Sequence, residues 1–115
     1  AVTIPVAVKM SPYFSAVADM AHRLDEAGAD GLVLFNRLLQ PDIDPETLGT
    51  VRAVTLSTPA DTRVPLTWIA LLHSRVHASL AASSGVEHAA DVAKYLLAGA
   101  DVVQSASALL RHGPE

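Results

Sequence analysis

The sequence predicts an α/β domain in which short parallel strands alternate with helices. The phrase Ala-Gly-Ala-Asp occurs twice, at residues 27–30 and 98–101, each time between an amphipathic stretch and an apolar run. Glycine most easily adopts the positive φ required just past a helix end, so each copy predicts a helix that stops and leads into a strand. Hydrophobic residues make up 50% of the 115, twenty residues are alanine, and only 4% are aromatic, which is typical of helices packed closely on a sheet.

Four strand–helix units follow one another along the chain. The first expected strand, residues 3–9, has no helical period, which indicates a strand buried on both faces. The helix expected at 15–27 places Val17, Met20, Ala21 and Leu24 on one face. The remaining expected elements are a strand at 31–35, a helix from Pro65 with Trp68, Ile69, Leu72 and Val76 on one face, a strand at 77–81, a helix at 87–97 with Ala89, Val92, Ala93, Leu96 and Leu97 inward, a strand at 101–104 and a helix at 107–111.

The segment 38–64 is the least regular part of the sequence. Asp44, Pro45 and Glu46 have the order of a helix cap, a first-turn proline and a first-turn acid, which predicts the start of a brief helix. We expect an extra strand at 51–56 and a turn at 57–61.

Strands that alternate with helices imply a parallel sheet with right-handed crossovers. Four such units make half of a (β/α)8 barrel, the TIM-barrel type; the alternative is a small open sheet with helices on both faces. In both architectures the functional edge lies at the carboxyl ends of the strands. Those ends are Lys9-Met10-Ser11, Phe35-Asn36-Arg37, Ala82-Ser83-Ser84-Gly85 and Ser105-Ala106-Ser107.

These residue types suit a ligand with an anionic group and a planar polar ring. Lys9 could bind an anion or donate to an electron-rich ring, or its ammonium could simply extend into water. Asn36 could present a donor and an acceptor to a ligand, or cap its loop. The loops at 84–85 and 106–107 each precede an expected helix, and backbone N–H groups in such loops bind phosphate.

Composition and spacing exclude several other classes of function. A net charge of −4 gives no electrostatic case for nucleic acid or an anionic membrane, and the absence of cysteine excludes disulfides, thiolate zinc sites and cysteine nucleophiles. His73 and His77 lack an acidic partner at metal-site spacing, and capping explains Asp42, Asp44 and Glu46 better than calcium does. We therefore expect no metal site. No apolar run approaches the roughly 20 residues that span a bilayer, so we expect a cytoplasmic protein.

Four segments in order resemble the C-terminal half of the flavin-dependent dihydroorotate dehydrogenase family. They are residues 4–14, 28–36, 80–86 and 97–104, the last running on to Ala108 and Leu109. The resemblance implies that residues 1–115 form the C-terminal half of an FMN-binding (β/α)8 barrel. By the same resemblance, Lys9 contacts the flavin ring, Asn36 lies close to flavin and substrate, and Ser84-Gly85 and Ala106-Ser107 hold the FMN phosphate.

The resemblance also implies the reaction, a hydride transfer between a dihydropyrimidine-like substrate and flavin, as in pyrimidine biosynthesis. Ser84 stands where the family has a phosphate-loop glycine, and Ser57-Thr58-Pro59 lies where the family tends to carry a glycine-containing loop near the flavin. The catalytic base is expected in the missing half of the barrel. We therefore expect a fragment of a longer enzyme, completed by the missing half or by a second copy. The alternatives are a non-catalytic half-barrel or phosphate-binding module, and another phosphate-binding barrel enzyme, for instance one acting on sugar phosphates.

Overall fold

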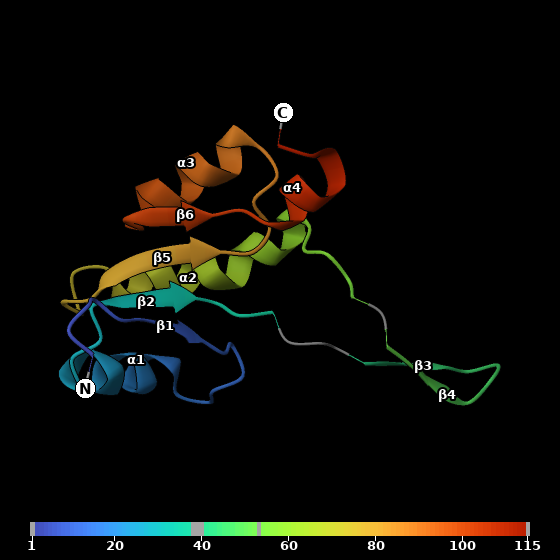
Figure 1. The fold of residues 1–115 in the computed structure, drawn as a ribbon, viewed down its shortest axis with the longest axis horizontal. Coiled ribbons are helices and arrows are strands. Elements are labelled where there is room, and N and C mark those ends of the chain that lie inside the picture. Colours follow the sequence, from blue (N-terminus) through green and yellow to red (C-terminus); the bar gives the residue numbers. More distant parts are fainter. Residues whose placement is uncertain (1, 38–40, 53, 115) are drawn as a thin grey trace.

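The computed structural model describes residues 2–37, 41–52 and 54–114. Its centre is a four-stranded parallel sheet with the strand order β1-β2-β5-β6 (Figure 1). The predicted alternation of parallel strands and helices is confirmed, with element ends that differ by a few residues. The strands are β1 (Ala7–Met10), β2 (Gly31–Leu34), β5 (Ser79–Ser83) and β6 (Val102–Gln104); the helices are α1 (Val17–Glu26), the 3-10 turn η1 (Pro59–Thr62), α2 (Arg63–Leu72), α3 (Ala89–Ala98) and α4 (Ser107–His112).

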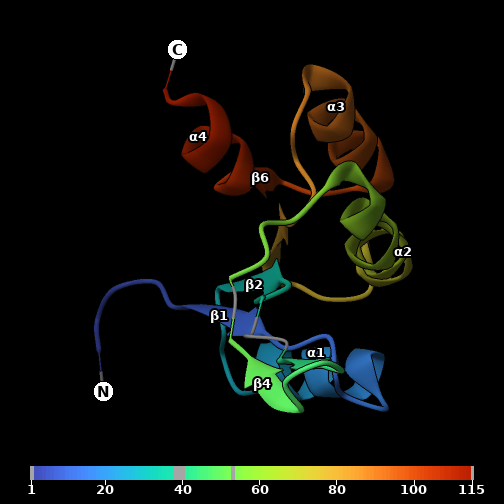
Figure 2. The same ribbon diagram turned by 90° about the vertical axis from the view of Figure 1, so that its right-hand side faces the viewer.

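Helices α1, α2 and α3 lie together on one side of the sheet (Figure 2). The strand residues that face them, such as Leu34 and Ala82, are fully buried and pack with Val17, Ile69 and Leu72. The predicted inward faces of α1 and α2 are thus confirmed at these positions. The alternative of an open sheet covered by helices on both faces does not describe this arrangement.

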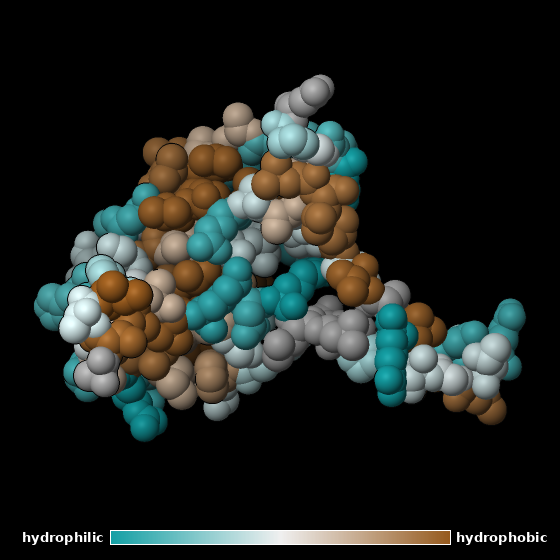
Figure 3. All heavy atoms as spheres, viewed as in Figure 1, coloured by the Kyte–Doolittle hydropathy of each residue, from teal (hydrophilic) through white to brown (hydrophobic). Residues whose placement is uncertain are grey.

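The opposite side of the sheet is largely uncovered by helices. One row of side chains on this side runs across the four strands and consists of Lys9, Val33, Ala81 and Val102. Both Lys9 and Val102 are exposed. The expected burial of the first strand on both faces is therefore wrong, because β1 is an edge strand with one open face. Hydrophobic surface gathers around the N-terminus and over β6, α3 and α4 in the view onto this side (Figure 3).

The two glycines of the repeated phrase end their helices as predicted. Gly28 has φ +91° and Gly99 has φ +109°. The N–H of the next residue reaches back to the last helical turn each time, from Ala29 to the Leu24 carbonyl at 3.0 Å and from Ala100 to the Tyr95 carbonyl at 3.0 Å. These bonds satisfy carbonyls that the helix leaves unpaired.

Three aspartates fix the amino ends of the strands through backbone N–H groups. Asp30 accepts from the Val6 N–H at 2.7 Å, and Asp101 accepts from the Leu80 N–H at 2.8 Å. Asp25, at the end of α1, accepts from the N–H groups of residues 77 and 78, just before β5. The His77 N–H in particular holds the pKa of Asp25 below its ordinary value.

The irregular segment contains a β-hairpin that projects from the body of the molecule (Figure 1). Strands β3 (Asp42–Asp44) and β4 (Gly49–Val51) pair antiparallel. The predicted brief helix at 44–46 and the predicted strand at 51–56 are wrong: Asp44 caps the hairpin turn, accepting from the Glu46 N–H at 2.9 Å and the Thr47 hydroxyl at 2.8 Å. Ala53 of that expected strand lies outside the described residues.

Helix α3 presents a different face to the core from the one predicted. Its buried residues are Asp91 and Tyr95, and Val92 packs partly against the core. The Asp91 carboxylate accepts from the N–H of His88 at 3.0 Å, and this capping bond helps to set how the helix sits. The predicted inward residues Ala89, Ala93, Leu96 and Leu97 are exposed, Leu97 at 89%.

No helix of the described ranges is both long enough and apolar enough to cross a membrane.

Replacing Asp101 with alanine is expected to lower the free energy of unfolding by about 1–2 kcal/mol, because the Leu80 N–H loses its charged acceptor. Chemical denaturation followed by circular dichroism measures the change. Glu26→Ala, which removes an exposed carboxylate without a side-chain hydrogen bond in the described residues, is the matched control. Equal effects of the two substitutions would contradict the role given to Asp101.

Candidate functional site

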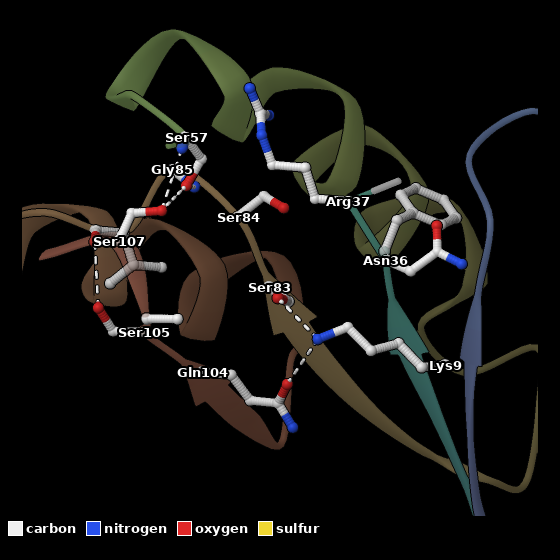
Figure 4. Close-up of a pocket in the computed structure, with 13 residues that line it drawn as sticks. Lys9, Asn36, Arg37, Ser57, Ser83, Ser84, Gly85, Gln104, Ser105 and Ser107 are labelled. Atoms are coloured by element: carbon white, nitrogen blue, oxygen red, sulfur yellow. Dashed lines mark hydrogen bonds between the residues drawn. The ribbon is translucent and has the colours of Figure 1, made fainter. Parts of the chain in front are cut away.

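The carboxyl ends of the four parallel strands line a pocket of about 380 Å³ (Figure 4). The pocket exists there because the parallel register brings all four strand ends to the same edge. All the residues that the sequence singled out as candidates line it: Lys9, Asn36, Ser84, Gly85, Ala106 and Ser107.

The Lys9 side chain extends from β1 across the open face toward β5 and β6 (Figure 4). Its Nζ donates to Ser83 Oγ at 3.4 Å and to Gln104 Oε1 at 3.3 Å. Both acceptors are neutral, and within the described ranges no carboxylate forms an ion pair with Lys9. The positive charge is thus oriented by the protein and not neutralised by it, which suits an anionic or electron-rich ligand.

Asn36 follows β2, and its backbone is fixed by a hydrogen bond from its N–H to the Met10 carbonyl at 2.7 Å. Its Oδ1 is buried and has no hydrogen-bond partner among the described residues, so this atom does not cap the loop. A buried acceptor without a partner costs free energy that a ligand N–H or O–H donor can recover. Asn36 therefore provides a place for a ligand donor.

The loop after β5 differs from the simple phosphate loop that the sequence suggested. Ser84 and Gly85 both have positive φ, +88° and +72°. A Cβ on Gly85 would lie 2.8 Å from the Thr58 carbonyl oxygen, so close packing against the segment before α2 requires glycine here. The Gly85 N–H donates to Ser57 Oγ at 3.1 Å, and α3 starts only at Ala89. This N–H is thus used within the chain.

Ser57 also belongs to the site, although the sequence analysis assigned it no role there. It is 5% exposed, lines the pocket and contacts Ser107. Its segment has no periodicity and was expected to form a turn, and only the family resemblance placed residues 57–59 near a flavin. Four other residues from the strand ends named in the sequence analysis line the pocket too, Phe35, Arg37, Ser83 and Ser105, together with Val86 and Gln104.

Two arginines connect the segments around the pocket. Arg37 donates to the Thr55 carbonyl at 2.9 Å and pairs with Asp61 at 3.3 Å. Burial acts to raise the pKa of Asp61, but the Thr58 N–H and the Arg37 guanidinium outweigh it and lower that pKa. Arg111 of α4 donates to the Ser57 carbonyl at 2.7 Å and to Glu87 at 2.8 Å.

The Arg37 side of the site adjoins a second pocket of about 370 Å³. The two pockets share Phe35, Asn36, Arg37 and Ser84. Neither pocket has metal-ligand chemistry: the described part of the chain contains no group of three or more His, Asp or Glu side chains that could hold a metal ion.

Replacing Asn36 with alanine is expected to change the free energy of unfolding by less than about 1 kcal/mol while weakening ligand binding, because Oδ1 has no partner in the protein itself. Thermal denaturation with and without ligand measures both effects. A loss of more than about 2 kcal/mol in the unliganded protein would show that Asn36 serves the fold.

Comparison with known proteins agrees with this geometry. The family model described as dihydroorotate dehydrogenase matches residues 1–115. The catalytic subunit of dihydroorotate dehydrogenase B (NAD(+)) from Halalkalibacterium halodurans is 36% identical over 104 residues, covering 88% of this chain and 34% of that protein. The corresponding subunit from Desulforamulus reducens is 35% identical over 108 residues, covering 91% and 36%. The chain thus spans about a third of the length of these relatives.

Solved structures show the same fold. The crystal structure of the Eimeria tenella enzyme DHODH in complex with ferulenol has a TM-score of 0.72 at 23% identity, covering 95% of this chain and 30% of that one. Its ligand-free form has a TM-score of 0.71 at 24% identity, covering 94% and 31%. Fold and sequence therefore agree that the chain belongs to the dihydroorotate dehydrogenase family, a family of oxidoreductases.

Proposed function

We propose that this chain is the FMN-binding part of a dihydroorotate dehydrogenase-type oxidoreductase, acting between a dihydropyrimidine-like substrate and flavin. The proposal rests on one observation: the six candidate residues, which come from four separate strand ends, all line one pocket. Membership of the dihydroorotate dehydrogenase family makes flavin the first ligand to consider for that pocket.

The residues present fit the chemistry of FMN, which when bound supplies a ring that exchanges hydride with a substrate. Lys9 offers an oriented positive charge that no carboxylate of the described residues neutralises, suited to an electron-rich ring. The unpartnered Oδ1 of Asn36 can accept from a ring or substrate N–H. Ser84 and Ser107 line the same pocket, and their hydroxyls suit the phosphate.

We further propose that the sheet is half of a (β/α)8 barrel, completed by more βα units or by a second copy of this chain. Helices α1 to α3 cover one side only (Figure 2), and Val102, which lies in the row of Lys9 on the other side, is 54% exposed. An uncovered sheet side with two free edges favours a partner that buries both. The catalytic base and the remaining substrate contacts would come from that partner.

The visible absorption spectrum tests this function. The protein, expressed at the full length that its gene encodes, is mixed with FMN and separated from the excess. We expect a retained flavin band and its bleaching by dihydroorotate. A retained band without bleaching would favour the non-catalytic phosphate-binding module instead, and a colourless folded protein that binds a sugar phosphate would favour the third alternative.

Replacing Lys9 with alanine is expected to weaken FMN affinity by about tenfold, the loss of one charge-assisted hydrogen bond to the ring. Flavin fluorescence quenching measures the dissociation constant. Lys94→Ala, at the chain's other lysine, which pairs with Asp91 outside the pocket, is the control. If the Lys9→Ala variant folds and its affinity for FMN is unchanged, Lys9 does not contact the flavin and only bridges β1 to β5 and β6.

A further inference from the structure

The loop after β5 carries a serine in a backbone conformation that serine rarely adopts. Ser84 has φ +88°, a region in which a residue with a Cβ is disfavoured. Ser84 nevertheless lines both pockets of the site, and its side chain points toward Arg37 (Figure 4). The conformation of this one residue therefore affects the shape of both pockets.

The Ser84 carbonyl is bound from the protein interior by Tyr95 of α3. The Tyr95 hydroxyl donates to this carbonyl oxygen at 2.8 Å and lies 3.5 Å from the carbonyl oxygen of Thr62, at the end of η1. Tyr95 is fully buried and lines neither pocket. Its hydroxyl therefore connects α3 to two segments that each contribute to a pocket wall.

The hydroxyl of Tyr95 contributes something that the ring alone would not. A phenylalanine would fill the same space in the core, and burying a hydroxyl costs free energy unless it finds an acceptor. In the described part of the chain, this hydroxyl has no hydrogen-bond partner apart from the two carbonyls beside the site. Burial raises the pKa of Tyr95, so the hydroxyl remains a donor. What the oxygen adds to a plain ring is thus a fixed position for the loop.

The neighbouring Gly85 limits where the loop can move. A Cβ on Gly85 would lie 2.7 Å from Thr62 Cγ2 and 2.8 Å from the Thr58 carbonyl oxygen. The loop is thus packed closely on η1 and bound at its carbonyl by Tyr95. A change in the direction of the Ser84 carbonyl would therefore shift the pocket wall.

We propose that Tyr95 is a positioning residue of this site: its hydroxyl holds Ser84 at the positive φ in which the loop after β5 can bind a ligand. Tyr95 itself does not touch the ligand. The inference rests on the proposed function, because it takes FMN as that ligand. Without the hydroxyl, a smaller fraction of the protein would hold the loop in its binding conformation, and the apparent dissociation constant would rise by the same factor.

The test removes the Tyr95 hydroxyl in three backgrounds that differ only at residue 84. Tyr95→Phe, which keeps the ring, is introduced into the native sequence, into Ser84→Ala and into Ser84→Gly. FMN dissociation constants are measured by fluorescence quenching in the protein at the full length that its gene encodes. Ser84→Ala and Ser84→Gly both lack the serine hydroxyl, but only glycine adopts a positive φ at little cost. The two backgrounds thus separate the backbone conformation from the loss of the serine hydroxyl.

We expect Tyr95→Phe to weaken FMN binding about fivefold to tenfold in the native sequence and in Ser84→Ala. In Ser84→Gly the same substitution should weaken binding less than about twofold, because glycine reaches the required conformation unaided. Thr67→Val is the matched control, since it removes a hydroxyl that donates to the Arg63 carbonyl on α2, outside both pockets. It should leave the FMN affinity of all three backgrounds unchanged.

Equal effects of Tyr95→Phe in all three backgrounds, or no effect in any, would overturn the inference and leave the proposed function standing, because the hydroxyl would then not act through Ser84. A Tyr95→Phe protein that fails to fold in every background would overturn it too, since the hydroxyl would then serve the fold as a whole. A wild-type protein that does not bind FMN would overturn the proposed function, and this inference with it.

Discussion

The fold depends on how the amino ends of neighbouring strands are tied together. In a parallel sheet every strand starts at the same edge, and a shift of one residue would turn each side chain to the other face. Asp30 and Asp101 prevent such a shift, because each stands at the start of its own strand and accepts an N–H from the neighbouring one. Asp25 does the same for β5 from the end of α1. Carboxylates at one edge of the sheet thus determine which residues meet at the other.

The pocket at the far edge is a consequence of that register. With Lys9 aligned to Val33 and Val33 to Ala81, the residues one or two positions further along reach the carboxyl edge together. Lys9 can then reach Ser83 and Gln104 across the open face, at 3.4 and 3.3 Å. The site depends on the order and register of these four strands.

The sequence predicted those features that depend on local chemistry and regular topology. Gly28 and Gly99 marked helix ends because few other residues take a positive φ at low cost, and the strand ends marked the pocket because parallel topology leaves one functional edge. Asp44 was ambiguous, since the same residue order caps a helix or a hairpin turn. Local chemistry gave no sign of Ser57, because its place in the site comes from long-range contacts to Gly85 and Ser107; only the family resemblance placed its segment near a flavin.

Tyr95 explains both the positive φ of Ser84 and the unexpected orientation of α3. It is fully buried, and its hydroxyl donates to the Ser84 carbonyl at 2.8 Å. Burial raises the pKa of Tyr95, so the hydroxyl stays protonated and remains a donor. That bond helps to hold Ser84 at a positive φ that serine rarely adopts. It also turns the Tyr95 face of α3 toward the core, which leaves Leu96 and Leu97 outside. A serine with positive φ is therefore tolerated here because a buried tyrosine two turns along the next helix fixes its backbone.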